Sequence, residues 1–163
     1  MSEQMQSIKI GLGLVMLVLI FGIISGAVFG VAEDSVKSYI AQGVEANPQV
    51  HDGSSKDKIW RYAQRAHFHA TGIAAFSIGL ELLIMFSVMA PKIKTATSIL
   101  VGLGGLYPLS WFTIFALAPS LGRDAAHHHF IAELFTYVGV GGLLLGIAML
   151  CANLFFGLLQ DSK

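Results

Sequence analysis

The chain has 163 residues, of which 55% are hydrophobic and only 12% are charged. An ordinary soluble domain carries roughly 25% charged residues, so we expect an integral membrane protein. The formal net charge is zero, which gives no indication of nucleic-acid binding, and the single cysteine excludes an internal disulfide.

Four long apolar segments follow one another, and each reaches the about 20 residues that a helix needs to cross the hydrocarbon core. We predict spans at about 10–31, 61–90, 97–118 and 126–159. The first is longer than the roughly 7–15 apolar residues of a signal peptide, so we expect it to be retained. The sequence therefore predicts an all-α integral membrane protein with one domain over residues 1–163, an antiparallel four-helix transmembrane bundle.

The first apolar segment carries a glycine at every fourth position of its second half. Gly22, Gly26 and Gly30 lie along one helix face, which permits the close approach of another helix. We expect this face to pack within the bundle or against a partner subunit.

The connection between the first two spans is the longest. Four apolar residues recur in it at helical spacing: Val36, Tyr39, Ile40 and Val44. Asn47-Pro48 then ends the pattern. This predicts a short amphipathic helix on the membrane surface, either as a lid over a site or as a connector that rests on the lipid headgroups.

The other connections are short. The sequence predicts a turn at Pro91-Lys92-Ile93-Lys94 between the second and third spans. It predicts a second turn over residues 118–123, with Asp124 as the N-cap of the fourth span.

Five histidines lie near the starts of the second and fourth spans, at one depth: His67, His69, His127, His128 and His129. Neutral imidazole is the commonest protein ligand for transition metals and for haem iron. In an antiparallel bundle the starts of these two spans meet at the same membrane face. The sequence thus predicts a haem or metal site there, whereas His51, in the polar loop, is expected to be an ordinary polar residue.

Helix geometry divides these histidines between faces. Residues two apart point about 200° apart, so His67 and His69 are not expected to bind one metal together. The three consecutive histidines are predicted to fan over about 200° in the first turn of the fourth span. One imidazole from each span is what six-coordinate haem iron requires, whereas three or more suit copper or zinc.

Charged residues near the histidines are candidates to support the predicted haem or metal site. Glu133 lies four residues after the last histidine and Asp124 three before the first of the triple, so both are candidates to accept a hydrogen bond from a ligand imidazole. Arg61 and Arg65, also four apart, are candidates to bind haem propionates.

Glu81 is an acidic residue in the middle of the second predicted span. It lies about 21 Å further along the helix than His67 and near the same face. Tyr107 is expected at a similar depth, as are Cys151 or Asn153. A carboxyl at this depth is expected to be protonated or paired, in a proton path, a quinone contact or a plain interhelical hydrogen bond.

The segment from Arg65 to Thr71 resembles the Arg-Ala-His-Ala-His-Leu-Asn signature of small membrane proteins similar to subunit I of haem–copper oxidases. In that superfamily a histidine near the start of the second span ligates low-spin haem, so the resemblance implies this role for His67 or His69. The resemblance covers the first two spans.

The chain also departs from that family. Three residues differ from the signature: Phe68 replaces Ala, Ala70 replaces Leu and Thr71 replaces Asn. Four spans are predicted rather than a dozen, and the chain has no full copper-centre motif, although His128-His129 is similar to its adjacent histidine pair. Autonomous oxygen reduction is therefore not expected.

The orientation has two opposing indications. The resemblance implies histidines toward the outer face of the bacterial inner membrane, with both termini cytoplasmic. Lysines and arginines number six on the histidine side and four on the other, and the positive-inside rule then favours the reverse. We follow the resemblance.

These features predict a membrane b-type cytochrome that binds haem b and serves as an electron-transfer subunit of a respiratory or other oxidoreductase complex. Expected partners are the lipid bilayer, other membrane subunits and a quinone. One alternative is a copper- or zinc-binding membrane subunit, in a metal enzyme or in metal handling. Another is a non-catalytic accessory subunit whose histidines make only polar contacts.

Overall fold

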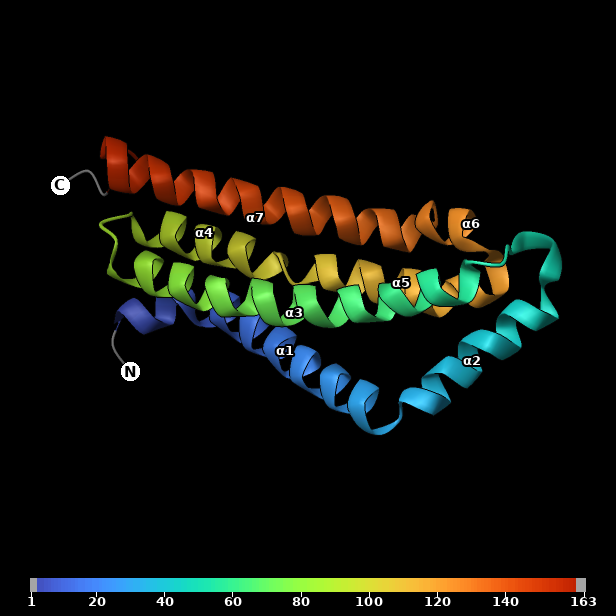
Figure 1. Ribbon diagram of the computed structural model, residues 1–163. Helices are drawn as coiled ribbons and strands as arrows, with labels where there is room; N and C mark the ends of the chain where they lie inside the picture. The colour runs from blue at the N-terminus through green and yellow to red at the C-terminus, as the bar shows by residue number, and fades with distance from the viewer. Residues whose placement is uncertain (1–2, 161–163) are drawn as a thin grey trace.

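The structure is a computed structural model that describes residues 3–160 of the chain. All regular structure in that range is helical, so the predicted all-α class is confirmed. The helices in chain order are α1 (Glu3–Val31), α2 (Glu33–Ala46), the short 3-10 helix η1 (Pro48–Val50), α3 (Ser55–Phe86), α4 (Pro91–Leu103), α5 (Leu106–Leu121), α6 (Arg123–His127) and α7 (Phe130–Phe156) (Figure 1).

Four helical stretches are long and apolar enough to cross a membrane: Gln4–Val31, Ser55–Phe86, Pro91–Leu121 and Phe130–Phe156. Their number and order agree with the prediction, but their bounds differ from the predicted 61–90, 97–118 and 126–159. The start of α1, the end of α7 and the α3–α4 connection lie at one end of the molecule, which we call the terminal end (Figure 1). Helix α2, η1 and the α5–α6 connection lie at the other end, which we call the histidine end.

The predicted amphipathic helix is present as α2, and it packs along the last turns of α5. Ile40 is its buried residue, and Tyr39 Oη donates a hydrogen bond to the carbonyl oxygen of Ala116 at 2.7 Å. A Cβ on Gly43 would collide with Pro119, so the two helices are in close contact. These contacts hold α2 against the histidine end of the bundle.

The third apolar stretch is two helices rather than one, because the chain turns at Gly104 and Gly105. The amide of Gly104 bonds to the carbonyl of Val101 at 3.0 Å and that of Gly105 to Gly102 at 3.2 Å. This i→i−3 pattern is tighter than that of an α-helix. A Cβ on Gly105 would collide with Val18, so α1 packs directly against the turn.

The predicted turn at Pro91-Lys92-Ile93-Lys94 is wrong, because these residues form the first turn of α4. Proline suits that place, since the first amides of a helix have no intrahelical acceptor. The chain reverses before Pro91 instead. Lys94 is buried, with only 8% of its surface exposed. Its Nζ donates hydrogen bonds to the carbonyl oxygens of Met85 (3.1 Å) and Ser87 (2.9 Å) at the end of α3.

Glycines let α1 pack closely on its neighbours. Gly11 faces Ser98 of α4, whereas Gly22 and Gly26 face α3, and a Cβ on any of these glycines would force the facing atoms to move. Gly30 has nothing within 4 Å of the place of a Cβ. The predicted glycine face is therefore a packing surface over only part of its length.

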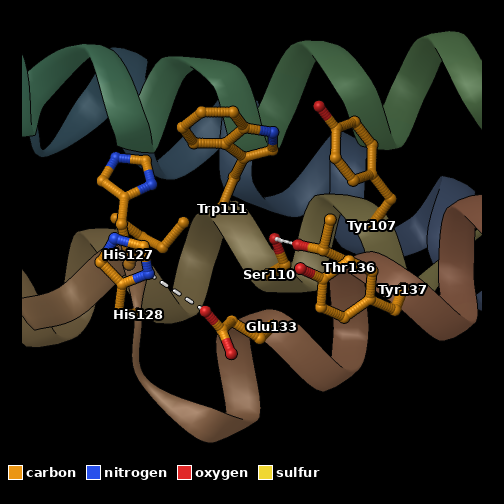
Figure 2. Close-up of a pocket in the computed structure, with 9 residues that line it drawn as sticks. Tyr107, Ser110, Trp111, His127, His128, Glu133, Thr136 and Tyr137 are labelled. Atoms are coloured by element: carbon orange, nitrogen blue, oxygen red, sulfur yellow. Dashed lines mark hydrogen bonds and ion pairs between the residues drawn. The ribbon is translucent and has the colours of Figure 1, made fainter.

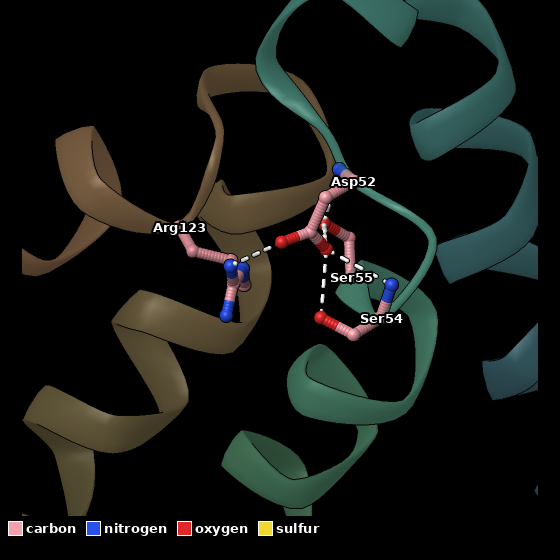
Figure 3. A network of polar contacts seen from close by, with 4 residues as sticks. All are labelled: Asp52, Ser54, Ser55 and Arg123. Atoms are coloured by element: carbon pink, nitrogen blue, oxygen red, sulfur yellow. Dashed lines mark hydrogen bonds and ion pairs between the residues drawn. The ribbon is translucent and has the colours of Figure 1, made fainter.

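A polar cluster fixes the loop before α3 to the start of α6 (Figure 3). Asp52 Oδ1 accepts hydrogen bonds from Ser54 Oγ (2.8 Å), Ser54 N (2.9 Å) and Ser55 Oγ (3.0 Å), and Oδ2 pairs with Arg123 Nη2 at 2.9 Å. The hydrogen bond from the Ser54 side chain, followed by that from Ser55, lowers the pKa of Asp52 to about 2.

Candidate functional site

His67 and His69 point to different sides of α3, as their spacing predicts. His67 faces α1, where its Nδ1 lies 2.8 Å from the carbonyl oxygen of Gly22 and its ring lies over Gly26. This imidazole is part of the α1–α3 contact.

His69 faces α5. Its Nδ1 lies 2.7 Å from the carbonyl oxygen of Arg65, so Nε2 is the ring nitrogen that remains for another partner. The ring meets Tyr107 edge-on, with centroids 5.0 Å apart, and stacks on Trp111 at 6.1 Å. His69 is thus part of an aromatic cluster between α3 and α5.

The three consecutive histidines lie at a break between α6 and α7, so their predicted place in the first turn of one helix is wrong. His127 ends α6, His128 follows it, and His129 is the N-cap of α7 with an extended backbone (φ −67°, ψ 132°). The Nδ1 atom of His129 accepts a hydrogen bond from the amide of Ile131 at 3.3 Å. Asp124 is not the predicted cap of the fourth span, because it lies in the first turn of α6.

His127 points toward the aromatic cluster. Its ring meets Tyr62 edge-on at 5.0 Å and Trp111 at 5.6 Å, and its ring nitrogens have no hydrogen bond within residues 3–160. Burial lowers the pKa of His127 below its ordinary value of 6.5, and the positive charge of the nearby Arg65 lowers it further. The imidazole is therefore neutral at physiological pH, which is the form that ligates metals.

His128 is exposed and lies between two carboxylates. Its Nδ1 is 3.1 Å from Glu133 Oε1, and its Nε2 is 3.9 Å from Asp124 Oδ1. Glu133 was predicted to serve His129 on a continuous helix. The break before α7 instead turns His129 into a cap and brings His128 to the carboxylate.

The two candidate arginines differ. The Arg65 guanidinium lies over the Trp111 ring at 4.7 Å and over the Tyr62 ring at 5.9 Å. Arg61 is exposed, and its side chain makes no polar or ring contact in the described part of the chain. The structure therefore brings Arg65, but not Arg61, to the aromatic cluster.

The sixth histidine lies outside this cluster. His51 Nε2 is 3.0 Å from the carbonyl oxygen of Pro119, so this residue links the loop before α3 to the end of α5. This contact agrees with the prediction of an ordinary polar residue.

A cavity of about 270 Å³ lies beside the histidines, between α5, the α6–α7 break and α7 (Figure 2). Its lining residues are Tyr107, Ser110, Trp111, Ile114, His127, His128, Glu133, Thr136 and Tyr137. In the wall of the cavity, Ser110 Oγ of α5 and Thr136 Oγ1 of α7 are hydrogen-bonded at 2.8 Å. Trp111 Nε1 is buried and has no hydrogen-bond partner among residues 3–160. Helix α2 does not line the cavity, so it is not a lid over it.

The sequence-based prediction omitted Trp111, the residue at the centre of this cluster. Tyr107 and Trp111 are four residues apart and so share one face of α5, which is the signal that identifies them. Tyr107 was expected at the depth of Glu81. It contacts His69 instead, and Glu81 lies about 18 Å further along α3.

The structure brings one histidine of α3 and one of α6 to the same aromatic cluster. His69 and His127 both contact Trp111, and His127 also contacts Tyr62, which precedes His69 by about 10 Å along α3. Among the described residues, these two imidazoles meet through Trp111 and not in a ring contact with each other. Within residues 3–160, no three His, Cys, Asp or Glu side chains are grouped to hold one metal ion.

Comparison with models of protein families, with curated proteins and with solved structures finds no match for this chain.

Proposed function

We propose that the four long helices cross the lipid bilayer as an antiparallel bundle. Their length and apolar character support this, as do connections that alternate between the histidine end and the terminal end (Figure 1). Large apolar residues remain exposed along α1 and α7, which supports contact with lipid or with other membrane subunits. The orientation that we propose places both termini in the cytoplasm and the histidine end outside the bacterial inner membrane.

We further propose that the protein is a redox subunit of a membrane complex and binds a quinone headgroup in the cavity at the histidine end. The observation that carries this proposal is an aromatic cavity whose Trp111 N–H is buried without an acceptor. An unsatisfied buried donor costs about 1–3 kcal/mol, and a quinone carbonyl oxygen would be its acceptor. The rings of Tyr107, Trp111 and Tyr137 supply surfaces on which a flat ligand stacks.

Cavity size favours a single ring over a porphyrin. The volume of about 270 Å³ is just below the roughly 300–1,000 Å³ of sites for drug-sized ligands. One six-membered ring fits in such a space, whereas the four pyrroles of haem span a much larger plane.

The His128–Glu133 pair supplies the proton chemistry that such a ligand needs. Oxidation of a quinol releases two protons and two electrons. The carboxylate of Glu133, 3.1 Å from His128 Nδ1, is placed to accept the two protons one after the other at the cavity wall and to pass each to the exposed imidazole of His128, which releases it to water. In this proposal, the electrons go to another subunit of the complex.

A b-type haem is the second candidate, favoured by the uncommitted nitrogens of His69 and the neutral His127. Either residue alone is a suitable axial ligand, with Arg65 beside it to pair with a propionate. The polar contacts of His51, His67 and His129 favour a structural role for those three residues.

Quinone binding is tested with full-length protein in lipid nanodiscs. Trp60→Phe leaves Trp111 as the only tryptophan, since the chain has two. We expect a short-chain ubiquinone to quench its fluorescence in a saturable manner. In this proposal the Tyr107 hydroxyl at the cavity wall donates to the other quinone carbonyl. Tyr107→Phe is therefore expected to weaken binding about 2- to 10-fold, the loss of one neutral hydrogen bond.

Tyr39→Phe is the matched control, because the Tyr39 hydroxyl is bonded to α5 away from the cavity. Its affinity is expected to equal that of the parent protein. Absence of saturable quenching, together with absence of co-purified quinone, would show the quinone proposal to be wrong. A Soret and α-band spectrum at one haem per chain would favour haem instead, and His69→Ala and His127→Ala would then identify the ligand.

A further inference from the structure

A buried carboxyl lies in the terminal half of the bundle, far from the cavity at the histidine end. Glu81 on α3 is 0% exposed. Its partner is Ser98 of α4 rather than a residue of α5 or α7. Gly11 of α1 allows this contact, because a Cβ there would collide with Ser98.

The distances around Ser98 indicate the charge state of Glu81. Ser98 Oγ lies 2.7 Å from Glu81 Oε2 and 3.2 Å from the carbonyl oxygen of Ile8. A hydroxyl has one proton to donate and a carbonyl has none, so Ser98 must share its proton between the two oxygens when Glu81 carries none. A protonated Glu81 donates to Ser98, which then donates its own proton fully to Ile8.

The surroundings of Glu81 also favour the acid. Oε1 is buried without a hydrogen-bond partner in the described part of the chain, and so is Ser77 Oγ one turn earlier. On the adjacent helices, Lys9 and Lys92 are exposed, and buried Lys94 donates to the carbonyls that end α3. A carboxylate with an unpaired oxygen in such a place is unfavourable.

A cavity lies on the terminal side of this contact. It has a volume of about 370 Å³ and is lined by Gln4, Ser7, Met89, Pro91 and Lys94. Lys94 precedes Ser98 by one turn of α4, or about 6 Å. Lys94, in the cavity wall, therefore lies on the terminal side of the Glu81–Ser98 contact.

We propose that Glu81 is a proton-binding site inside the bundle, and that it exchanges its proton with water at the terminal end. On release, the proton passes from the carboxyl to a water molecule, and the Ser98 hydroxyl turns from the Ile8 carbonyl to the new carboxylate. One proton moves and no electron does. The site is independent of the quinone cavity and stands whatever that cavity binds.

Infrared spectroscopy of the full chain in nanodiscs tests the proposal, because a protonated carboxyl has a C=O stretch distinct from that of a carboxylate. We expect the wild-type protein to show this band at neutral pH, to lose it as the pH is raised and to regain it when the pH is lowered again. Glu81→Gln is expected to lack the band at neutral pH, whereas Glu45→Gln, a change at an exposed residue, keeps it.

A further variant keeps the test decisive if Glu81→Gln does not fold. Ser98→Ala is expected to shift the frequency of the band, since the acid loses its hydrogen-bond partner. If the wild-type spectrum lacks the band at neutral pH, Glu81 is ionised there and the proposal is overturned. If the band persists at every pH at which the protein stays folded, the Glu81 carboxyl does not exchange its proton with water, which also overturns the proposal.

Discussion

Gly26 sets how closely His67 approaches α1. The imidazole ring lies where a Cβ on Gly26 would be, while its Nδ1 bonds to the carbonyl of Gly22 one turn earlier. At the residue scale, the lack of a side chain on Gly26 gives the His67 ring the space to pack against α1. Because His67 faces α1, it is not part of the cluster around Trp111.

Gly26→Ala is expected to destabilise the protein by about 1–3 kcal/mol, the usual effect of overpacking. Gly30→Ala is the control on the same helix face, because nothing lies within 4 Å of its Cβ position. Its stability is expected to stay the same or rise slightly. The midpoint of unfolding in mixed detergent–SDS micelles measures both, and equal midpoints for the two variants would contradict the close packing of His67.

Asp52 is expected to make stability depend on pH in the acid range. Its pKa in the folded state, about 2, is below the ordinary value of 3.8. The ionised carboxylate therefore stabilises the fold above about pH 4, and this contribution is lost as the pH falls toward about 2. Asp52→Asn should unfold at a lower temperature than the wild type at neutral pH, with a difference that shrinks over this range.

Arg123→Gln is the comparison variant for Asp52. The hydrogen bonds from Ser54 and Ser55 outweigh the charge of Arg123 in lowering the pKa of Asp52. Removal of the guanidinium is therefore expected to leave most of the acid dependence in place. A thermal-unfolding difference between Asp52→Asn and wild type that stays constant from about pH 4 to about pH 2 would refute this account.

Single-residue predictions from the sequence hold where helix geometry alone decides them. The divergence of His67 and His69 follows from the 3.6-residue turn, and the structure shows it. The importance of Trp111 depends on which face of α5 meets α3, which is a tertiary property. The partner of Glu133 was mispredicted for a related reason, because the assignment to His129 assumed an unbroken helix.

At the scale of helices, the break between α6 and α7 is the feature that the sequence conceals. Helix starts are usually marked by Ser, Thr, Asp, Asn or Gly, and histidine is not among them. Asp124 is one of these residue types, and it lies in the first turn of a helix. That helix is the five-residue α6 and not α7. Helix α2, by contrast, was predictable from its spacing of apolar residues.

The cap formed by His129 is testable by replacement. His129→Ala is expected to cost about 0.5–2 kcal/mol and to speed amide exchange at Ile131, whereas His129→Ser, a good cap, restores both. Unfolding midpoints and hydrogen–deuterium exchange measure these effects. A ligand role for His129 would give the opposite pattern, with cofactor lost equally in both variants and exchange at Ile131 unchanged.

At the scale of the whole molecule, apolar length was enough to predict four helical stretches that are long and apolar enough to cross a membrane, in the correct order. It was not enough to predict the turn at Gly104 and Gly105, because glycines are common in spans that remain straight. It also did not show that the histidine end is closed by loops and short helices. Those contacts join residues that are distant in the sequence, such as Asp52 and Arg123.

The proposed topology predicts that Gly53 and Lys92 lie on opposite sides of the membrane. Each position is exposed and is replaced by cysteine in a Cys151→Ala background, which has no other thiol. In sealed vesicles of one orientation, a membrane-impermeant maleimide should label one variant and not the other. Gly13→Cys, on an exposed face of α1, should remain unlabelled because lipid covers it. Labelling of Gly53→Cys and Lys92→Cys from the same side would exclude the antiparallel bundle.

The contacts that close the histidine end also bear on the order in which the chain is assembled. Tyr39, His51 and Asp52 bind partners that lie 77, 68 and 71 residues later in the chain. During synthesis, α2 and the loop after it leave the ribosome long before those partners exist, because α3, α4 and most of α5 are made in between. The cavity is completed later still, because Glu133, Thr136 and Tyr137 of α7 line it, so ligand binding there would report that the last helix is in place.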